Sequence, residues 1–280
     1  MLNDLRQTAR QLLADKKVDV VIGYGQADPA GPAYPVFITR PEDTEQLVFN
    51  DRCYNNLTTF LTRKEIRAMG RAAVLVKGCD AKSVVVLAVE SQIDRQSVVV
   101  IGMACNGVGQ PSLAKCRTCD VHMPRHTDMV IGQAADHAIE AKDRYAELAE
   151  MMSKSASERL AYWGQELSRC VKCYACRQVC PMCYCERCVA DKNQPQVIKT
   201  SATTMGNLAW QINRAFHLAS RCVGCDECTR ACPAGINLRL LNLMLAQATE
   251  EQFDYRPGMD KDAQPVLGCF SVKDKECFIK

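Results

Sequence analysis

Long apolar runs are absent from this sequence. The longest, SVVVLAV at residues 83 to 89 and SVVVIGMAC at 97 to 105, fall far short of the roughly 20 residues that span a bilayer, so we predict no membrane span. The opening residues, MLNDLRQTARQLLADKK, also lack the apolar stretch of a signal peptide. We therefore expect a cytoplasmic protein in a reducing compartment, where thiols do not pair as disulfides.

Aromatic residues and clustered positive charge are scarce as well. Phe, Trp and Tyr make up 6% of the 280 residues, and the net charge is +3, with Lys and Arg scattered among Asp and Glu. The chain offers few stacking platforms for bases and no basic stripe, which argues against a nucleic-acid partner. The sequence also lacks a recognisable Ser/His/Asp set, phosphate-binding loop or paired-carboxylate site, so we predict no bond-making catalytic site within the chain.

Cysteine, by contrast, is abundant, with 18 residues. Residues 170 to 181 read CVKCYACRQVCP, and the same spacing returns at 222 to 233 as CVGCDECTRACP. Cys-x2-Cys-x2-Cys-x3-Cys-Pro is the run that binds four-iron cubane clusters in bacterial two-cluster ferredoxins. Three thiolates placed three residues apart wrap one loop around three irons, and the fourth is free to reach the neighbouring cluster. The proline ends the loop because its nitrogen has no hydrogen to donate.

This arrangement predicts two [4Fe-4S] clusters with crossed ligands. The predicted ligands of one cluster are Cys170, Cys173, Cys176 and Cys232, and those of the other are Cys222, Cys225, Cys228 and Cys180. The alternative is structural zinc in an interaction module without a redox role, because zinc also binds paired Cys-x2-Cys motifs. Zinc needs only four ligands and leaves the third and fourth cysteines of each run without a use, so the clusters are favoured.

Helices separate and follow the two runs. The segment TMGNLAWQINRAFHLASR at 204 to 221 places Leu208, Ile212, Ala215 and Ala219 on one helical face, and GINLRLLNLMLAQATEEQF at 235 to 253 is also typical of a helix. The region resembles the α-helical two-cluster ferredoxin domains of heterodisulfide reductase small subunits and of fumarate reductase iron–sulfur subunits. We predict such a domain at 170–250, followed by a C-terminal tail at 251–280.

The first half of the chain has a different pattern. Helical stretches alternate with short β-branched runs that favour buried strands. The expected strands lie at 16–24, 33–39, 72–78, 97–104 and 128–132, and the expected helices at 3–17, 62–71 and 81–91. This alternation predicts an α/β domain with a short mixed or parallel sheet at 1–133. A charged helix at 134–169 is expected to connect it to the mainly α-helical ferredoxin domain.

Four cysteines of this half, Cys79, Cys105, Cys116 and Cys119, stand where predicted strands end and loops begin. Because strand ends converge at one edge of an α/β sheet, loops far apart in sequence can bring these thiolates together. A third cluster is therefore one interpretation. Isolated cysteines are also often small buried side chains, and spacing alone leaves both interpretations open.

Three stretches, GCDAKSVVVLA, IGMACNGVG and KCRTCDVHMPRHTDMVIG, resemble the beta subunits of deazaflavin-dependent hydrogenases and formate dehydrogenases, within residues 10 to 135. In that family a Cys-Asp-Ala loop, a Cys-Asn/Gly-Gly loop and a Cys-x2-Cys followed by Pro-Arg-x2-Asp supply one four-iron cluster. The matching residues here are Cys79, Asp80 and Ala81; Cys105; Cys116 and Cys119; and Pro124, Arg125 and Asp128. The resemblance implies a third cluster and a role in passing electrons between a two-electron donor and a metalloenzyme.

The same family binds a flavin in a region entered through a Ser/Gly-rich turn, where backbone amides at a helix start can meet phosphate. This chain begins instead with a helix whose first turn holds Asn3 and Asp4, and an acidic side chain there repels phosphate. The glycine–proline segment at 23–35 is explained as a loop. We therefore predict that the chain binds no flavin, with loops such as GMACNGVG as the alternative place for one.

Six cysteines remain outside these sets: Cys53, Cys183, Cys185, Cys188, Cys269 and Cys277. Three of them lie in PMCYCERC, directly after the first run. They either bind additional metal, with Cys269 or Cys277 arriving from the tail, or remain reduced thiols near a partner surface. The four histidines, His122, His126, His137 and His217, form no ligand-spaced set.

Together these features predict an iron–sulfur electron-transfer subunit of a multisubunit oxidoreductase, with three [4Fe-4S] clusters and about twelve irons. As the resemblance implies, the expected partners include a hydrogenase, a formate dehydrogenase or a heterodisulfide reductase-like flavoprotein. The alternative within the redox class is a flavin-containing subunit that itself oxidises a reduced deazaflavin or NAD(P)H.

Overall fold

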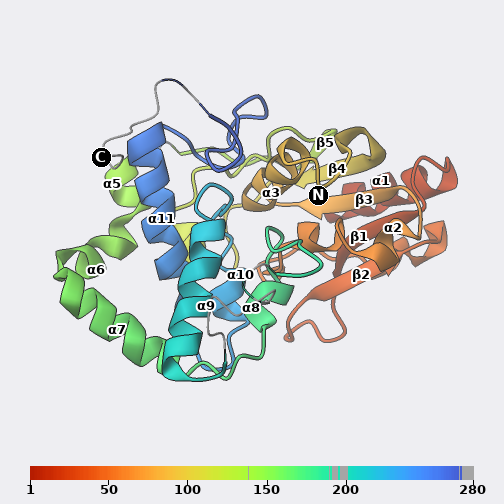
Figure 1. Ribbon diagram of the computed structural model, residues 1–280. Helices are drawn as coiled ribbons and strands as arrows, with labels where there is room; N and C mark the ends of the chain where they lie inside the picture. Colours follow the sequence, from red (N-terminus) through yellow and green to blue (C-terminus); the bar gives the residue numbers. More distant parts are fainter. Residues whose placement is uncertain (138, 189, 191–194, 196–200, 271, 273–280) are drawn as a thin grey trace.

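The computed structural model describes residues 1–137, 139–188, 190, 195, 201–270 and 272. Five strands form one sheet in the order β2-β1-β3-β4-β5, shown on the right of Figure 1. The strands are β1 Val20–Gly25, β2 Tyr34–Ile38, β3 Ala72–Val76, β4 Val98–Met103 and β5 Met129–Ile131. The β1 and β2 strands pair antiparallel, and the remaining pairs are parallel. The predicted α/β domain therefore has a mixed sheet.

Burial explains the β-branched composition of the central strands. Every residue of β1, β3 and β4 is buried, as expected for parallel strands covered on both faces. Helix α1, Leu2–Ala14, buries Leu5, Ala9, Leu12 and Leu13, which share one face because they are spaced three or four residues apart. Helix α3, Gly78–Val89, packs against β3 and β4. The first turn of α3 therefore lies at the end of a central strand.

Shorter elements complete this half. The helix expected at 62–71 is a single turn, α2 at Lys64–Arg67, and another turn, α4, spans Ala114–Arg117. Short 3-10 helices lie at Pro41–Gln46, Leu57–Phe60 and Arg95–Ser97.

The connector is helical, but the prediction of one helix at 134–169 is wrong. The chain forms α5 at Ala141–Arg144, a 3-10 turn at Ala146–Leu148, α6 at Ala149–Ser153 and α7 at Ala156–Ser168. Ser155 starts α7 anew through a capping box. The amide of Ser155 donates to Glu158 Oε2 at 2.7 Å, and the amide of Glu158 donates to Ser155 Oγ at 3.3 Å. Such reciprocal bonds satisfy amides that a continuing helix would use internally.

The second half is built from α8 at Ala175–Gln178, α9 at Thr204–His217, α10 at Glu227–Arg230 and α11 at Leu238–Phe253. Its apolar core contains side chains from α7, α9 and α11 and from the 3-10 turn at Ala146–Leu148. Among them are Leu148, Trp163, Leu167, Trp210 and Leu243. Figure 1 shows these helices beside the sheet. Among the described residues, no helix combines the length and the apolar character needed to cross a membrane.

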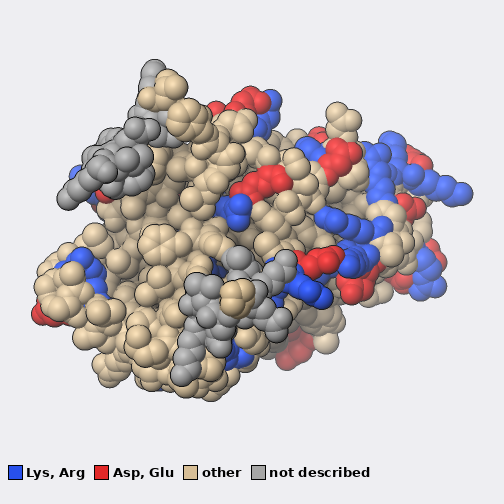
Figure 2. Space-filling model, in the orientation of Figure 1, with Lys and Arg blue, Asp and Glu red and all other residues tan. Residues whose placement is uncertain are grey.

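Polar contacts join the two halves. Glu90, at the end of α3, accepts a hydrogen bond from Arg221 Nε at 2.6 Å and another from the Tyr184 hydroxyl. Arg63 Nη2 donates to the carbonyl of Gln178 at 2.6 Å. On the face in Figure 2, charged side chains gather over the sheet half, whereas the helical half is largely uncharged.

Candidate iron–sulfur centres

The two cysteine runs have the same local backbone conformation. Residues on both sides of the second cysteine take left-handed angles, with φ of 55° at Lys172 and 60° at Tyr174 in the first run, and 71° at Gly224 and 63° at Asp226 in the second. Each run then enters a one-turn helix, α8 or α10, that carries the third cysteine. The sequence repeat is therefore also a structural repeat.

One cavity contains the first predicted ligand set. Cys170, Cys173 and Cys176 line it together with Cys232, which comes from the second run. The cavity has about 390 Å³ of empty space, and Trp210, Ile236 and Leu238 form part of its apolar wall. The structure thus brings together side chains that the crossed arrangement groups and that lie far apart in the sequence.

The second predicted set lies beside the first. Cys180, Cys222 and Cys225 belong to one apolar cluster with Met182 and Leu218. Cys228 is buried next to them in the main helical core. Burial raises the pKa of the Cys228 thiol, and the charges of Cys222 and Cys225 raise it further, so these three sulfurs lie within electrostatic range of one another.

The buried face of α9 carries polar side chains as well as Trp210 and Ala215. Leu208, Ile212 and Ala219 are only half-buried, whereas Asn207, Gln211 and Arg214 are buried. Of the four residues placed on one helical face, Ala215 is buried and Leu208 packs against the helical core. Polar side chains are buried as well because α9 packs against the cysteine loops, where their hydrogen-bond donors find partners.

These donors contact the cysteines directly. Gln211 Nε2 lies 4.0 Å from Cys170 Sγ and 3.9 Å from Cys176 Sγ. Arg214 Nη2 donates to the carbonyl of Cys176 at 3.1 Å, and Asn242 Nδ2 from α11 donates to Cys228 Sγ at 3.6 Å. Hydrogen bonds to cluster sulfurs are one of the means by which proteins set cluster reduction potentials.

The donor set fits iron–sulfur clusters. Burial raises the pKa of Cys225 to about 12, so this thiol ionises only beside a compensating positive charge, which iron supplies when bound. Within the described residues, no three His, Cys, Asp or Glu side chains lie close enough together to hold a single metal ion. A four-iron cube takes one thiolate at each iron, and four cysteines, Cys170, Cys173, Cys176 and Cys232, line one cavity.

Replacing Gln211 with leucine is expected to lower the reduction potential of the cluster next to Cys170 and Cys176. The substitution removes N–H···S contacts that stabilise negative charge on sulfur. A loss of about 1 kcal/mol for one hydrogen bond corresponds to roughly 40 mV for a one-electron couple. Redox titration followed by electron paramagnetic resonance measures the shift. Gln247→Leu is the matched control, because Gln247 is half-buried on α11 and its described hydrogen bond is to Glu251, not to a cysteine; equal potentials in both variants would contradict the expectation.

The four N-terminal cysteines follow strands or lie in the loops beyond them. Cys79 is in the first turn of α3, after β3, and Cys105 follows β4. Cys116 lies in α4, and Cys119 lies two residues beyond its end. The amide of Gly107 donates to Cys105 Sγ and the amide of Val108 donates to Cys116 Sγ, each at 3.4 Å. Backbone amides therefore point toward two of these four sulfurs.

These four thiols are also electrostatic neighbours. Burial raises the pKa of Cys79 well above its usual value, with a further contribution from the charge of Cys119. Burial likewise raises the pKa of Cys105 and of Cys119, and in both cases the charge of Cys116 adds to the effect. The structure thus gathers Cys79, Cys105, Cys116 and Cys119 in one region.

The other residues of the resembling motifs hold loops in place. Asp128 Oδ2 accepts from the amide of Val100 at 2.6 Å, and its Oδ1 pairs with Arg95 Nη2 at 3.0 Å. Arg125 pairs with Asp136 at 3.0 Å. Arg125 and Asp128 therefore fasten the segment that follows Cys119.

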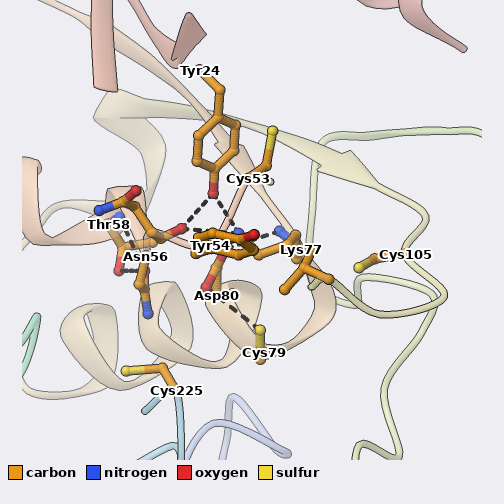
Figure 3. Close-up of polar contacts among 12 residues, drawn as sticks. Tyr24, Cys53, Tyr54, Asn56, Thr58, Lys77, Cys79, Asp80, Cys105 and Cys225 are labelled. Carbon is orange, nitrogen blue, oxygen red and sulfur yellow. Dashed lines mark hydrogen bonds and ion pairs between the residues drawn. The ribbon is translucent and has the colours of Figure 1, made fainter. Parts of the chain in front are cut away.

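A buried polar network next to Cys79 is not evident from the sequence (Figure 3). Lys77 Nζ lies 2.7 Å from Asp80 Oδ2, contacts the Tyr24 hydroxyl and donates to the carbonyl of Asn55 at 2.9 Å. Burial by itself lowers the pKa of the Lys77 ammonium, but the charges of Asp80 and Tyr24 raise it well above its usual value. Asp80 belongs to the Cys-Asp-Ala motif of the family resemblance, whereas no sequence pattern predicted a role for Lys77 or Tyr24.

His122 and Lys115 are two further residues that sequence reasoning missed. The ring nitrogens of His122 lie 2.8 Å and 3.1 Å from the carbonyl oxygens of Cys105 and Cys119. Lys115 Nζ donates to the carbonyl of Cys225 at 3.0 Å, and so links the N-terminal half to the second run. Burial lowers the pKa of Lys115, but the nearby charge of Cys79 contributes to a net rise. Nothing in the sequence around Lys115, which directly precedes Cys116, predicted that it would link the two halves of the chain.

Comparison with known proteins agrees with this arrangement. Residues 166–236 match the family model of the 4Fe-4S dicluster domain. Over 92% of both chains, the protein is 21% identical to the F420-dependent formate dehydrogenase subunit beta of Methanocaldococcus jannaschii. It is 23% identical to the F420-dependent formate dehydrogenase 1 subunit beta of Methanococcus maripaludis, over 92% of this chain and 91% of the relative.

These similarities confirm the predicted class. The chain is an iron–sulfur electron-transfer subunit of an oxidoreductase complex, and its dicluster domain is of the 4Fe-4S type.

Proposed function

We propose that the chain relays electrons through three [4Fe-4S] clusters. The N-terminal cluster is bound by Cys79, Cys105, Cys116 and Cys119. The middle cluster is bound by the set around Cys222, and the last cluster by the set around Cys170. The observation that carries this proposal is one pocket lined by Cys79, Cys119 and Cys222. This shared pocket supports a close approach of the N-terminal set to the second ferredoxin set. Because the second set in turn adjoins the first, the three sets form a continuous series for electron transfer.

Partner subunits would exchange electrons at the two ends of this series. Near the first set, Val171 lies between two predicted ligands and is 68% exposed. Met205 and Phe216 of α9 are also exposed large apolar side chains. Exposed apolar groups beside a cluster favour close approach of another redox protein. The similarity to beta subunits of F420-dependent formate dehydrogenases supports formate dehydrogenase as the partner enzyme and F420 as the two-electron carrier; a hydrogenase or a heterodisulfide reductase-like flavoprotein are the other partners in this proposal.

The relay is tested with Cys79→Ala in the complex purified anaerobically from its native cells. We expect formate- or hydrogen-dependent electron throughput to fall at least about tenfold, because a missing cluster interrupts the series, while iron falls by about four per chain. The paramagnetic signals of the two ferredoxin clusters should remain.

Cys53→Ala is the matched control. Its thiol is also buried, and burial raises its pKa to about 11, but it belongs to no predicted ligand set. Full throughput in Cys79→Ala despite the loss of four irons would contradict the relay.

A flavin-containing subunit that itself oxidises reduced deazaflavin or NAD(P)H is the second candidate, since the relatives are F420-dependent. Our proposal is that this chain carries no flavin of its own and is fed by another subunit. Acid extraction of the isolated anaerobic chain followed by fluorescence distinguishes the two: near-stoichiometric flavin would favour the second candidate.

A further inference from the structure

Three cysteines that the relay does not use face a common cavity. Cys183, Cys185 and Cys188 line it together with Met182 and Leu218. Trp210 contributes to its walls and to those of the cavity lined by Cys170, Cys173, Cys176 and Cys232. The third group of thiols thus lines a cavity that shares the Trp210 side chain with the cavity of the first predicted cluster.

Three arginines, Arg177, Arg214 and Arg221, line this cavity, and Arg221 is paired with Glu90 at 2.6 Å. Arg214 is only 4% exposed, and its Nε is buried without a hydrogen-bond partner. A buried, unpaired donor on a cation is costly unless negative charge faces it. The thiolate of Cys183 would supply part of that charge, beside those of the ferredoxin cysteines Cys180, Cys228 and Cys176.

The loop that carries the three cysteines is held in place. The Tyr184 hydroxyl, between Cys183 and Cys185 in the sequence, donates to Glu90 of α3. Arg177 Nη2 of α8 donates to the carbonyl of Cys185 at 3.0 Å. The backbone on both sides of Cys185 is therefore fixed against neighbouring elements.

We propose that Cys183, Cys185 and Cys188 bind an additional [4Fe-4S] cluster. Each thiol loses its proton as its sulfur binds one iron, and no electron is exchanged in that step. The fourth iron takes its ligand from outside this trio. Among the described residues, no three His, Cys, Asp or Glu side chains lie close enough together to hold a single metal ion, so the proposal is a multi-iron cluster and not a lone ion. The proposal does not depend on the identity of the partner subunits.

The experiment compares iron and acid-labile sulfide in the anaerobic full-length chain and in its Cys183→Ala/Cys185→Ala/Cys188→Ala variant. We expect the variant to contain about four fewer irons and four fewer sulfides per chain, and its reduced form to lose one paramagnetic signal while the others persist. Cys269→Ala, which changes an exposed cysteine that does not line the cavity, should keep the full content.

If the triple variant loses every cluster, the single variant Cys185→Ala provides the test. This side chain is exposed, so its truncation leaves the core intact and should still lower the iron content. Unchanged iron in Cys185→Ala, or in a triple variant that retains its other clusters, would overturn the proposal. The relay would survive that result, because the iron bound by the other three sets is counted separately.

Discussion

Replacing Cys232 with alanine is expected to abolish the cluster of the first run, although Cys232 belongs to the second. Cys232 shares a cavity with Cys170, Cys173 and Cys176. Cys180 instead shares an apolar cluster with Cys222 and Cys225. Removing one of four cysteine ligands exposes one iron of the cube, and metal binding is coupled to folding of the loop that supplies the ligands. The effect should therefore be large: loss of one cluster and a weakened loop.

Two reference variants identify the affected cluster. Cys173→Ala removes an exposed ligand of the first run, and Cys222→Ala removes one of the second. In electron paramagnetic resonance of reduced protein, Cys232→Ala should lose the same signal as Cys173→Ala. Cys180→Ala should lose the same signal as Cys222→Ala. The opposite pairing would show that each run binds its own cluster and that the crossed assignment is wrong.

The ferredoxin loops were predictable because their determinants are local. Three-residue spacing, two left-handed residues around Cys173 and Cys225, and a terminal proline specify a loop within twelve residues of sequence. The two halves of the fold were predictable for a similar reason, since β-branched runs at strand length mark a buried sheet and longer periodic segments mark helices.

The environment of the cysteines could not be predicted, because it depends on residues far apart in the sequence. Gln211 and Arg214 have no distinguishing local pattern, and an apolar-face criterion selects Leu208 and Ile212 instead. Only tertiary packing against the loops at Cys170 and Cys176 makes the polar side of α9 the buried one. Periodicity reports which residues avoid water in an ordinary core, and it fails where the buried partner is a set of sulfurs.

The N-terminal cysteines illustrate the same limit. Their positions after strands predicted that they could meet, but not what surrounds them. Lys115 lies 110 residues before Cys225, the residue whose carbonyl it contacts. A buried lysine is disfavoured by ordinary burial preferences, and it is tolerated here because the carbonyl oxygens of Tyr54 and Cys225 accept hydrogen bonds from it and Glu227 lies 4.0 Å away. Strained or charged buried groups of this kind are expected where function overrides ordinary burial preferences.

Replacing Asp80 with asparagine is expected to destabilise the sheet half strongly. Asp80 is fully buried and its Oδ2 lies 2.7 Å from the ammonium of Lys77, which is 1% exposed. Asparagine has nearly the same shape, so packing is retained while the charge is lost. The Lys77 ammonium is then buried without its counter-charge, and breaking a buried pair in this way costs about 3–5 kcal/mol. For a domain of this size the unfolding temperature should fall by roughly 10 °C.

The measurement is thermal unfolding of the anaerobic chain, followed by far-ultraviolet circular dichroism. Asp262→Asn is the control, because the Lys261–Asp262 pair is exposed on both sides and such pairs contribute about 0–1 kcal/mol. The double variant Lys77→Met/Asp80→Asn removes the unpaired ammonium as well, so it should recover part of the loss. If Asp80→Asn unfolds within a degree or two of the control, Lys77 does not depend on Asp80. In that case the contacts of Lys77 with Tyr24 and Asn55 must hold its charge, and the network beside Cys79 would stabilise the fold through those hydrogen bonds instead.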